Sequence, residues 1–183
     1  MNIDYNMVTA LMAIVSSLVA IYAVVNEGRR SGFSLRMDLL FKINDQFNHP
    51  DFTQKRKNAA KFILKLKDKQ NYSKWSSSDL DDILDLFQAV SSLTERGALD
   101  KDILWEYYSY WLLNYYEVSK EYIAFIQKEY PQTWESVEWL YKVFVKLENK
   151  EYKVTKRKYT VRSQTELIEF LVDESKLRTN KNG

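Results

Sequence analysis

The hydrophobic residues form one unbroken run near the start of the chain, and afterwards they recur every three or four positions. The run covers residues 7–25 (MVTALMAIVSSLVAIYAVV), nineteen positions without a charge. At about 1.5 Å per residue, a helix of this length just crosses a hydrocarbon core of about 30 Å. Backbone groups find no water there, so the segment must be helical. The pattern therefore predicts an N-terminal transmembrane helix.

A cleaved signal peptide is the main alternative for this run, and a buried core helix is the second. Signal peptides begin with basic residues and end at a small-residue cleavage site. This chain begins MNIDYN and the run ends in AVVN, so we favour a true span. Arg29, Arg30 and Arg36 follow the span, and no Lys or Arg precedes it. This asymmetry predicts that the N-terminus is outside and that the rest of the chain is cytoplasmic.

Small residues form a stripe along the predicted span. Thr9, Ala13, Ser16 and Ala20 recur at three-to-four spacing. Such stripes let helices approach closely in lipid, so the span offers a surface for a homo-oligomer. The simpler interpretation is that Ala and Ser only fill the span, and the sequence leaves both interpretations open.

The residues after the span keep the spacing that is typical of amphipathic helices. The first helix is expected to continue as a stalk to about Asn48, and Pro50 ends it, because proline disfavours the helical region for the residue before it. Further helices are expected over residues 51–67, from Ser78 to Gly97, over 100–129, after Pro131, and after Ser163.

Capping residues support several of these ends. Ser78 is the predicted N-cap of its helix, with aspartates after it at the positive end of the helix dipole. Gly97 suits the left-handed conformation that often follows a helix. Ser163 and Glu166 have the spacing of a capping box. Apolar residues follow this box at Leu167, Ile168 and Leu171.

The helix over residues 100–129 has the densest aromatic run in the chain. Its apolar residues alternate steps of four and three, a seam of heptad type. The seam consists of Leu104, Tyr108, Trp111, Tyr115, Val118, Tyr122 and Phe125. Packing in the core is the interpretation we favour, and a ligand pocket or a surface that stacks bases is the alternative.

The helix over residues 51–67 has one apolar side and many lysines elsewhere. Phe52, Ala59, Ile63 and Leu66 line the apolar side. Arg56 falls in the gap between the first two, where its aliphatic stem is expected to cover apolar surface.

The basic stretch over residues 149–162 (NKEYKVTKRKYTVR) suits either a short β element near 151–162 or an extended linker. Four glycines and two prolines argue against a turn-rich β fold. The expected class is all-α, with a compact cytoplasmic bundle of about five helices joined to the span. We divide the chain into residues 1–27 (tail and transmembrane helix), 28–148 (helical cytoplasmic domain) and 149–183 (basic linker, short helix and tail).

The residues that catalysis and cofactors need are scarce. There is no cysteine and His49 is the single histidine, so a zinc site would need three carboxylates. The sequence contains no glycine-rich phosphate loop, G-x-S-x-G or HExxH pattern. Asp79, Asp81, Asp82 and Asp85 resemble a Mg²⁺ or general-acid cluster, but helix capping explains the first three better. We expect no metal, no cofactor and no enzyme, with His49 in a capping or surface role.

Charge is segregated along a chain whose net charge is only +2. Residues 79–102 contain seven acids and two bases, a net of −5, whereas residues 142–162 contain eight bases and two acids, a net of +6. Basic segments of membrane-tethered proteins often lie on anionic lipid, at about 1 kcal/mol per residue near the surface. Solvation, pairing with the acidic helix, or a protein partner are the alternatives, and nucleic acid is the least favoured. The candidate contacts for lipid or a partner are Lys153, Lys156, Arg157, Lys158 and Arg162.

Three segments resemble a widespread bacterial family of uncharacterised proteins: FNHPDFTQKR, LDLFQAVSSLTERGALDKDILWEYYSYWLLNYY and YPQTWESVEWLY. The shared pattern is a short acidic helix, a turn from Gly97 to Asp100, and then an aromatic-rich helix, and the resemblance covers roughly residues 5–148. It implies a single-pass protein of the bacterial inner membrane with a compact helical cytoplasmic domain. It brings no activity, cofactor or catalytic residue.

These features together predict a membrane-anchored, non-catalytic interaction or adaptor module. A small membrane effector, such as a toxin or a phage-defence component, is the alternative, and a cytoplasmic enzyme is the third. An enzyme predicts a concave pocket with converging polar groups. An adaptor predicts an exposed apolar or charged patch, and an effector predicts growth arrest on overexpression.

Overall fold

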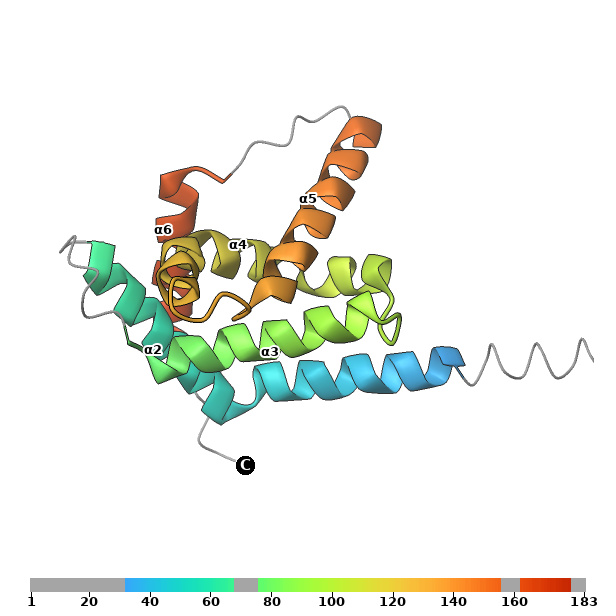
Figure 1. Ribbon diagram of the computed structural model, residues 1–183, viewed down its shortest axis with the longest axis horizontal. Helices are drawn as coiled ribbons and strands as arrows, with labels where there is room; N and C mark the ends of the chain where they lie inside the picture. The colour runs from blue at the N-terminus through green and yellow to red at the C-terminus, as the bar shows by residue number, and fades with distance from the viewer. Residues whose placement is uncertain (1–31, 68–75, 156–161, 179–183) are drawn as a thin grey trace, which may run out of the picture. The chain divides into compact units, whose positions relative to one another are not determined.

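The computed structural model describes residues 32–67, 76–155 and 162–178, and the chain divides into two units, residues 1–39 and 40–183 (Figure 1). All regular structure in the described residues is helical, which confirms the all-α class. Residues 32–48 are helical, and the later helices are α2 (Pro50–Lys67), α3 (Ser78–Glu95), α4 (Lys101–Gln127), α5 (Glu135–Thr155) and α6 (Gln164–Ser175).

The predicted span, residues 7–25, lies outside the described residues, and so do Thr9, Ala13, Ser16 and Ala20. In the part of the chain that the structure describes, no helix combines the length and the apolar character needed to cross a membrane. The fold and the site below belong to the second unit.

Local hydrogen bonds place the starts of α2 and α6 where the sequence predicts them. The carbonyl oxygen of His49 accepts from the Thr53 N–H at 2.8 Å, and its Nδ1 accepts from the Asp51 N–H at 3.4 Å, so the capping role of His49 is confirmed. The capping box of α6 is also confirmed. The Glu166 carboxylate accepts from the Ser163 N–H at 2.6 Å, and Ser163 Oγ accepts from the Glu166 N–H at 3.3 Å.

The ends of α3 and the start of α4 need one correction. The N-cap of α3 is Ser77, not Ser78, because Ser77 has extended backbone (φ −148°, ψ 101°) and its Oγ accepts from the Leu80 N–H at 3.3 Å. Gly97 has the expected left-handed conformation, with φ +74°. The Asp100 carboxylate accepts from two N–H groups of the first turn of α4, at 2.9 and 3.2 Å, which confirms it as the N-cap.

The prediction of a short β element near residues 151–162 is wrong for residues 151–155, because these residues complete α5. Residues 156–161 lie outside the described part of the chain. Basic residues at a helix C-terminus interact favourably with the helix dipole, so a lysine-rich ending suits α5. At its other end α5 follows Trp134, a buried residue in the left-handed region at φ 57°.

The helices of the second unit surround α4. α2 packs on α3 and α6, α5 packs on α3 and α4, and α6 packs on α2 and α4 (Figure 1). In the middle of α4 four consecutive residues are buried, namely Leu112, Leu113, Asn114 and Tyr115. Four successive positions point in all directions around a helix, so α4 is enclosed on every side there. This confirms α4 as the core helix.

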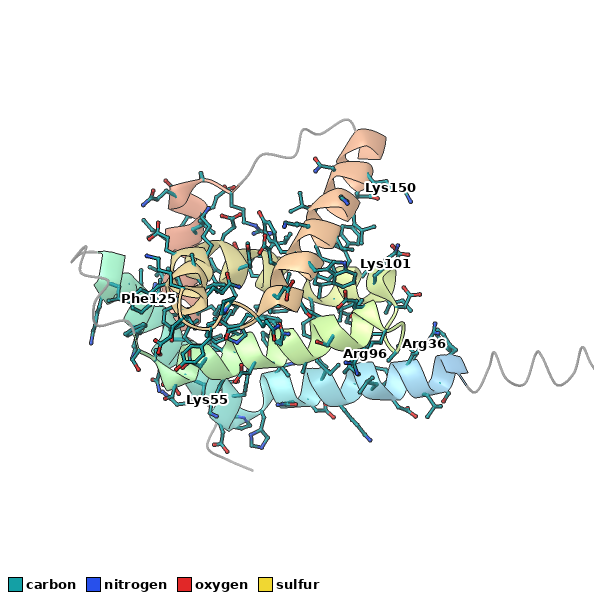
Figure 2. All side chains as sticks on the ribbon, viewed as in Figure 1. Arg36, Lys55, Arg96, Lys101, Phe125 and Lys150 are labelled. Atoms are coloured by element: carbon teal, nitrogen blue, oxygen red, sulfur yellow. The ribbon has the colours of Figure 1, made fainter. Side chains whose placement is uncertain are left out.

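The aromatic seam of α4 faces the core over most of its length. Its buried members are Leu104, Tyr108, Tyr115, Val118 and Tyr122. Phe125 departs from the expectation, since it lies in the last turn of α4 and is 38% exposed (Figure 2). Trp111 is only half-buried. The core is therefore centred on Tyr115 and its neighbours rather than on Trp111.

Candidate functional site

Three polar side chains from three helices meet in the interior between α2, α4 and α6. Arg56 of α2 donates to both carboxylate oxygens of Glu174 in α6, from Nε at 2.8 Å and from Nη2 at 2.6 Å. The hydroxyl of Tyr115 in α4 donates to the same carboxylate at 2.6 Å. The side chains of Arg56 and Glu174 are only 5% and 6% exposed, and Tyr115 is fully buried. These three residues form the buried polar cluster.

Aromatic rings enclose the buried polar cluster. The Arg56 guanidinium carbon lies 4.0 Å from the centroid of the Phe47 ring and 5.8 Å from that of Trp111. Phe170 meets Tyr115 edge to face, with ring centroids 5.1 Å apart. A cation that faces such rings gains about 0.5–1 kcal/mol at an exposed site and about 2 kcal/mol or more where water is excluded. The surroundings therefore compensate a charge that has lost its solvation.

The electrostatics of the cluster follow from burial and pairing. Burial alone would lower the pKa of Arg56, but the hydrogen bonds and the charge of Glu174 outweigh it and the pKa is raised. Burial and the negative charge of Glu174 raise the pKa of Tyr115 well above its usual value. The phenol of Tyr115 thus stays protonated beside the charged guanidinium of Arg56. The role of the buried polar cluster is structural: its three side chains bond one another, are excluded from solvent, and so join α2, α4 and α6.

The acidic helix α3 uses its aspartates to hold other parts of the bundle. Asp82 accepts from Lys55 Nζ of α2 at 2.6 Å. Asp81 accepts from the hydroxyl of Tyr122 in α4 at 2.6 Å.

Asp85 of the same helix accepts from the indole N–H of Trp134 at 2.8 Å. This bond holds the turn before α5, where Trp134 has its left-handed backbone. Burial raises the pKa of Asp81, and the nearby Asp85 and Asp82 add to the shift while the hydrogen bond from Tyr122 opposes it. Each of these aspartates thus has a partner from another part of the fold, and no group of three or more metal-ligating side chains occurs in the described residues.

The structure places the predicted basic contacts only in part. Lys156, Arg157 and Lys158 lie outside the described residues, and Lys153 is described only as a backbone position in α5. Arg162 is half-buried, and its guanidinium carbon lies 5.4 Å from the centroid of the Tyr110 ring.

Further lysines precede these residues on α5. Lys142, Lys146 and Lys150 recur at steps of four, so they share one face of the helix. Lys142 pairs with Glu138 at 2.6 Å, while Lys146 and Lys150 are exposed, and Figure 2 shows Lys150 near the outer end of α5. Each of the three aspartates of α3 with which the basic segment might pair already has a partner, since Lys55, Tyr122 and Trp134 bond Asp82, Asp81 and Asp85.

Sequence reasoning missed the buried polar cluster, although both charges stand in core positions of their helices. Arg56 interrupts the apolar side of α2, and the sequence predicts only that its aliphatic stem covers apolar surface there. Glu174 follows Leu167, Phe170 and Leu171 on the inward face of α6. Each of the two helices has one charged residue at a core position. These two opposite charges were the signal in the sequence that could have revealed the pair.

The geometry defines a small all-α domain whose polar side chains bond one another between helices. Residues 10–144 match the profile of DUF4760, a domain of unknown function, and this match covers most of the chain. The chain therefore belongs to the DUF4760 family. No curated protein and no solved structure matches it. The match ends before the last turns of α5, so α6 and Glu174 lie beyond it.

Replacing Glu174 by Leu should lower the free energy of unfolding by about 3–5 kcal/mol, because it leaves Arg56 buried without a partner. The double change Arg56→Met with Glu174→Leu should recover most of this loss. Urea unfolding followed by circular dichroism measures both. The control is Lys55→Met with Asp82→Leu, an ion pair that is about 40% exposed and should matter far less. A loss below about 1 kcal/mol for Glu174→Leu would contradict the role of the pair.

Alkaline pH should destabilise the fold through its buried tyrosines. Burial raises the pKa of Tyr116 to about 12 and raises the pKa values of Tyr108, Tyr115 and Tyr122 as well. In the unfolded chain tyrosine ionises near pH 10, so unfolding releases protons above that pH. Stability is therefore complete below about pH 10 and is lost as the pH rises toward the folded-state values.

The measurement for this pH dependence is the free energy of unfolding in steps from about pH 8 to pH 11. Tyr115→Phe should give a shallower decline above pH 10, by up to about 1.4 kcal/mol per pH unit, because one buried phenol no longer titrates. A decline that is the same in Tyr115→Phe and in the unchanged chain would show that Tyr115 does not contribute.

Proposed function

We propose that this DUF4760 protein is a membrane-anchored, non-catalytic interaction module of the bacterial inner membrane, with its helical domain in the cytoplasm. The observation that supports the anchor is the run of nineteen uncharged residues, 7–25, followed by arginines. Residues 10–25 of this run fall within the part that matches the family.

The use of the polar groups supports a role in interaction rather than in catalysis. Glu174 bonds Arg56 and Tyr115, and the aspartates of α3 bond Lys55, Tyr122 and Trp134. Catalytic acids and bases must reach a substrate, whereas these groups join one helix to another. Residues 142–162 contain eight bases and two acids, a net charge of +6.

The basic surface is proposed to contact anionic lipid. α5 extends to Thr155, so position 153 continues the face that Lys142, Lys146 and Lys150 occupy. The lipid contacts proposed are Lys153, Lys156, Arg157 and Lys158. Arg162 belongs to the proposed set with less weight, because its guanidinium already lies over the Tyr110 ring. A tethered domain presents these charges to the bilayer at high local concentration.

The anchor is tested with a reporter fused after Gly183, which should be active in the cytoplasm, and with a carbonate wash, which should leave the protein in the membrane. The matched control is Leu11→Arg with Leu18→Arg, because each arginine costs about 2.5–3.5 kcal/mol on insertion. That variant should be released by carbonate. Periplasmic activity of the fusion would overturn the orientation, and release of the unchanged protein would overturn the span.

The lipid contact is tested with a chain that starts at Ser34 and with vesicles that contain phosphatidylserine. This chain should bind these vesicles at least tenfold more tightly than neutral ones, and salt should release it, because about 0.1 M salt screens exposed charges beyond about 10 Å. Changing Lys153, Lys156, Arg157 and Lys158 to Gln should abolish the difference.

The control for the lipid experiment changes the same amount of charge elsewhere. It replaces four exposed lysines by Gln, and they are Lys42, Lys61, Lys65 and Lys101. The control should keep the preference for anionic vesicles if the basic segment makes the contact. Equal losses in the two variants would show that only the overall charge of the domain matters.

A further inference from the structure

The C-terminal helix α6 is fastened to helices that are remote from it in the sequence. It packs on α2 and α4. In Figure 1 the last described turn of α5 and the first turn of α6 lie well apart. α6 also has its own capping box at Ser163 and Glu166. It is therefore a self-contained element that the chain joins to α5.

All the buried contacts of α6 come from one face. Leu167, Phe170, Leu171 and Glu174 are buried, whereas Glu166, Glu169 and Asp173 are exposed. The spacing of i, i+3, i+4 and i+7 is that of a helix lying in a groove. A helix that binds through one face can make the same contacts whichever chain it belongs to.

The groove that receives α6 belongs to the family domain, and the helix that fills it does not. Arg56, Tyr110 and Tyr115 lie within residues 10–144, which match DUF4760, whereas α6 begins at Gln164. The groove also has a defined chemistry. Phe170 packs edge to face on Tyr115 and Tyr110, with centroid distances of 5.1 and 5.7 Å, and Arg56 binds the carboxylate.

Arg56 determines which helix the groove accepts. Glu174, the carboxylate on the buried face of α6, receives two hydrogen bonds from the Arg56 guanidinium. A helix with an apolar residue in place of that carboxylate would leave Arg56 buried without a partner, which is strongly unfavourable. The groove therefore selects a helix with one apolar face and a carboxylate at the position of Glu174, and every copy of this chain supplies such a helix as α6.

We infer that α6 is an exchangeable helix, which fills the α2–α4 groove of its own chain in a monomer and the groove of a second copy in a dimer. Exchange of an identical element keeps every contact, so it forms dimers at low cost. The chain from Thr155 to Gln164 spans at most about 30 Å, which sets how far α6 reaches from its own domain. This inference stands independently of the membrane anchor.

The test mixes two full-length variants in mild detergent. Arg56→Met removes the charged partner in the groove and keeps Glu174, whereas Glu174→Leu removes the charged partner on α6 and keeps Arg56. Exchange between them creates one native charged pair and one uncharged pair, and each variant alone has neither. The mixture should form at least tenfold more heterodimer, counted by pull-down with two tags, than either variant forms homodimer. Equal association in all three samples overturns the inference.

The matched control uses the ion pair between α2 and α3, two helices that do not exchange. Mixing Lys55→Met with Asp82→Leu should give no gain in heterodimer, although these side chains lie only 2.6 Å apart. A gain of the same size in the control would overturn the inference, because it would arise from association by another route.

A second measurement leaves the ion pair intact, in case the single variants do not fold. The chain has no cysteine, so Tyr110→Cys in one tagged chain and Phe170→Cys in another provide unique sites for a short thiol cross-linker. Cross-links between the two chains support exchange. When both substitutions are placed in one chain, cross-links that form only within that chain, at every protein concentration, overturn it.

Discussion

Arg56 and Glu174 lose their water together when the domain folds, and this loss constrains the rest of the structure. Moving a charged group from water into a protein interior costs several kcal/mol per ion, and close pairing with further hydrogen bonds offsets that cost. The two carboxylate oxygens of Glu174 receive Arg56, and one also receives Tyr115. Neither charge is tolerable in the core without the other. The packing of α2 therefore depends on the packing of α6.

The dependence of α2 on α6 explains which helices lie side by side around α4. α2 and α6 must close together over Tyr115, because that hydroxyl completes the hydrogen bonds of the carboxylate. The aspartates of α3 fasten the opposite side through Tyr122 and Trp134. Each bond joins segments that are far apart in the sequence, so the polar side chains fix which helix faces which. Apolar contacts alone tolerate several such arrangements.

The sequence predicted the candidate site less well than the fold. It identified the core helix α4, the left-handed Gly97 and the capping box at Ser163, since each depends on residues within a few positions of one another. It assigned a role only to the aliphatic stem of Arg56 and gave Glu174 no role. Their pairing spans 118 positions, and no local pattern reports a partner at that distance. The β element suggested near 151–162 is wrong for residues 151–155, because α5 continues through them.

By itself the sequence determined the all-α class, the order of the helices and most of their ends. Hydrophobic periodicity, capping side chains and proline act within one or two turns, so they can be read along the chain. Only the tertiary structure decided which charges are buried and what they bind. The free energy of a buried charge depends on the groups that surround it in space, and those groups come from α2, α4 and α6 together.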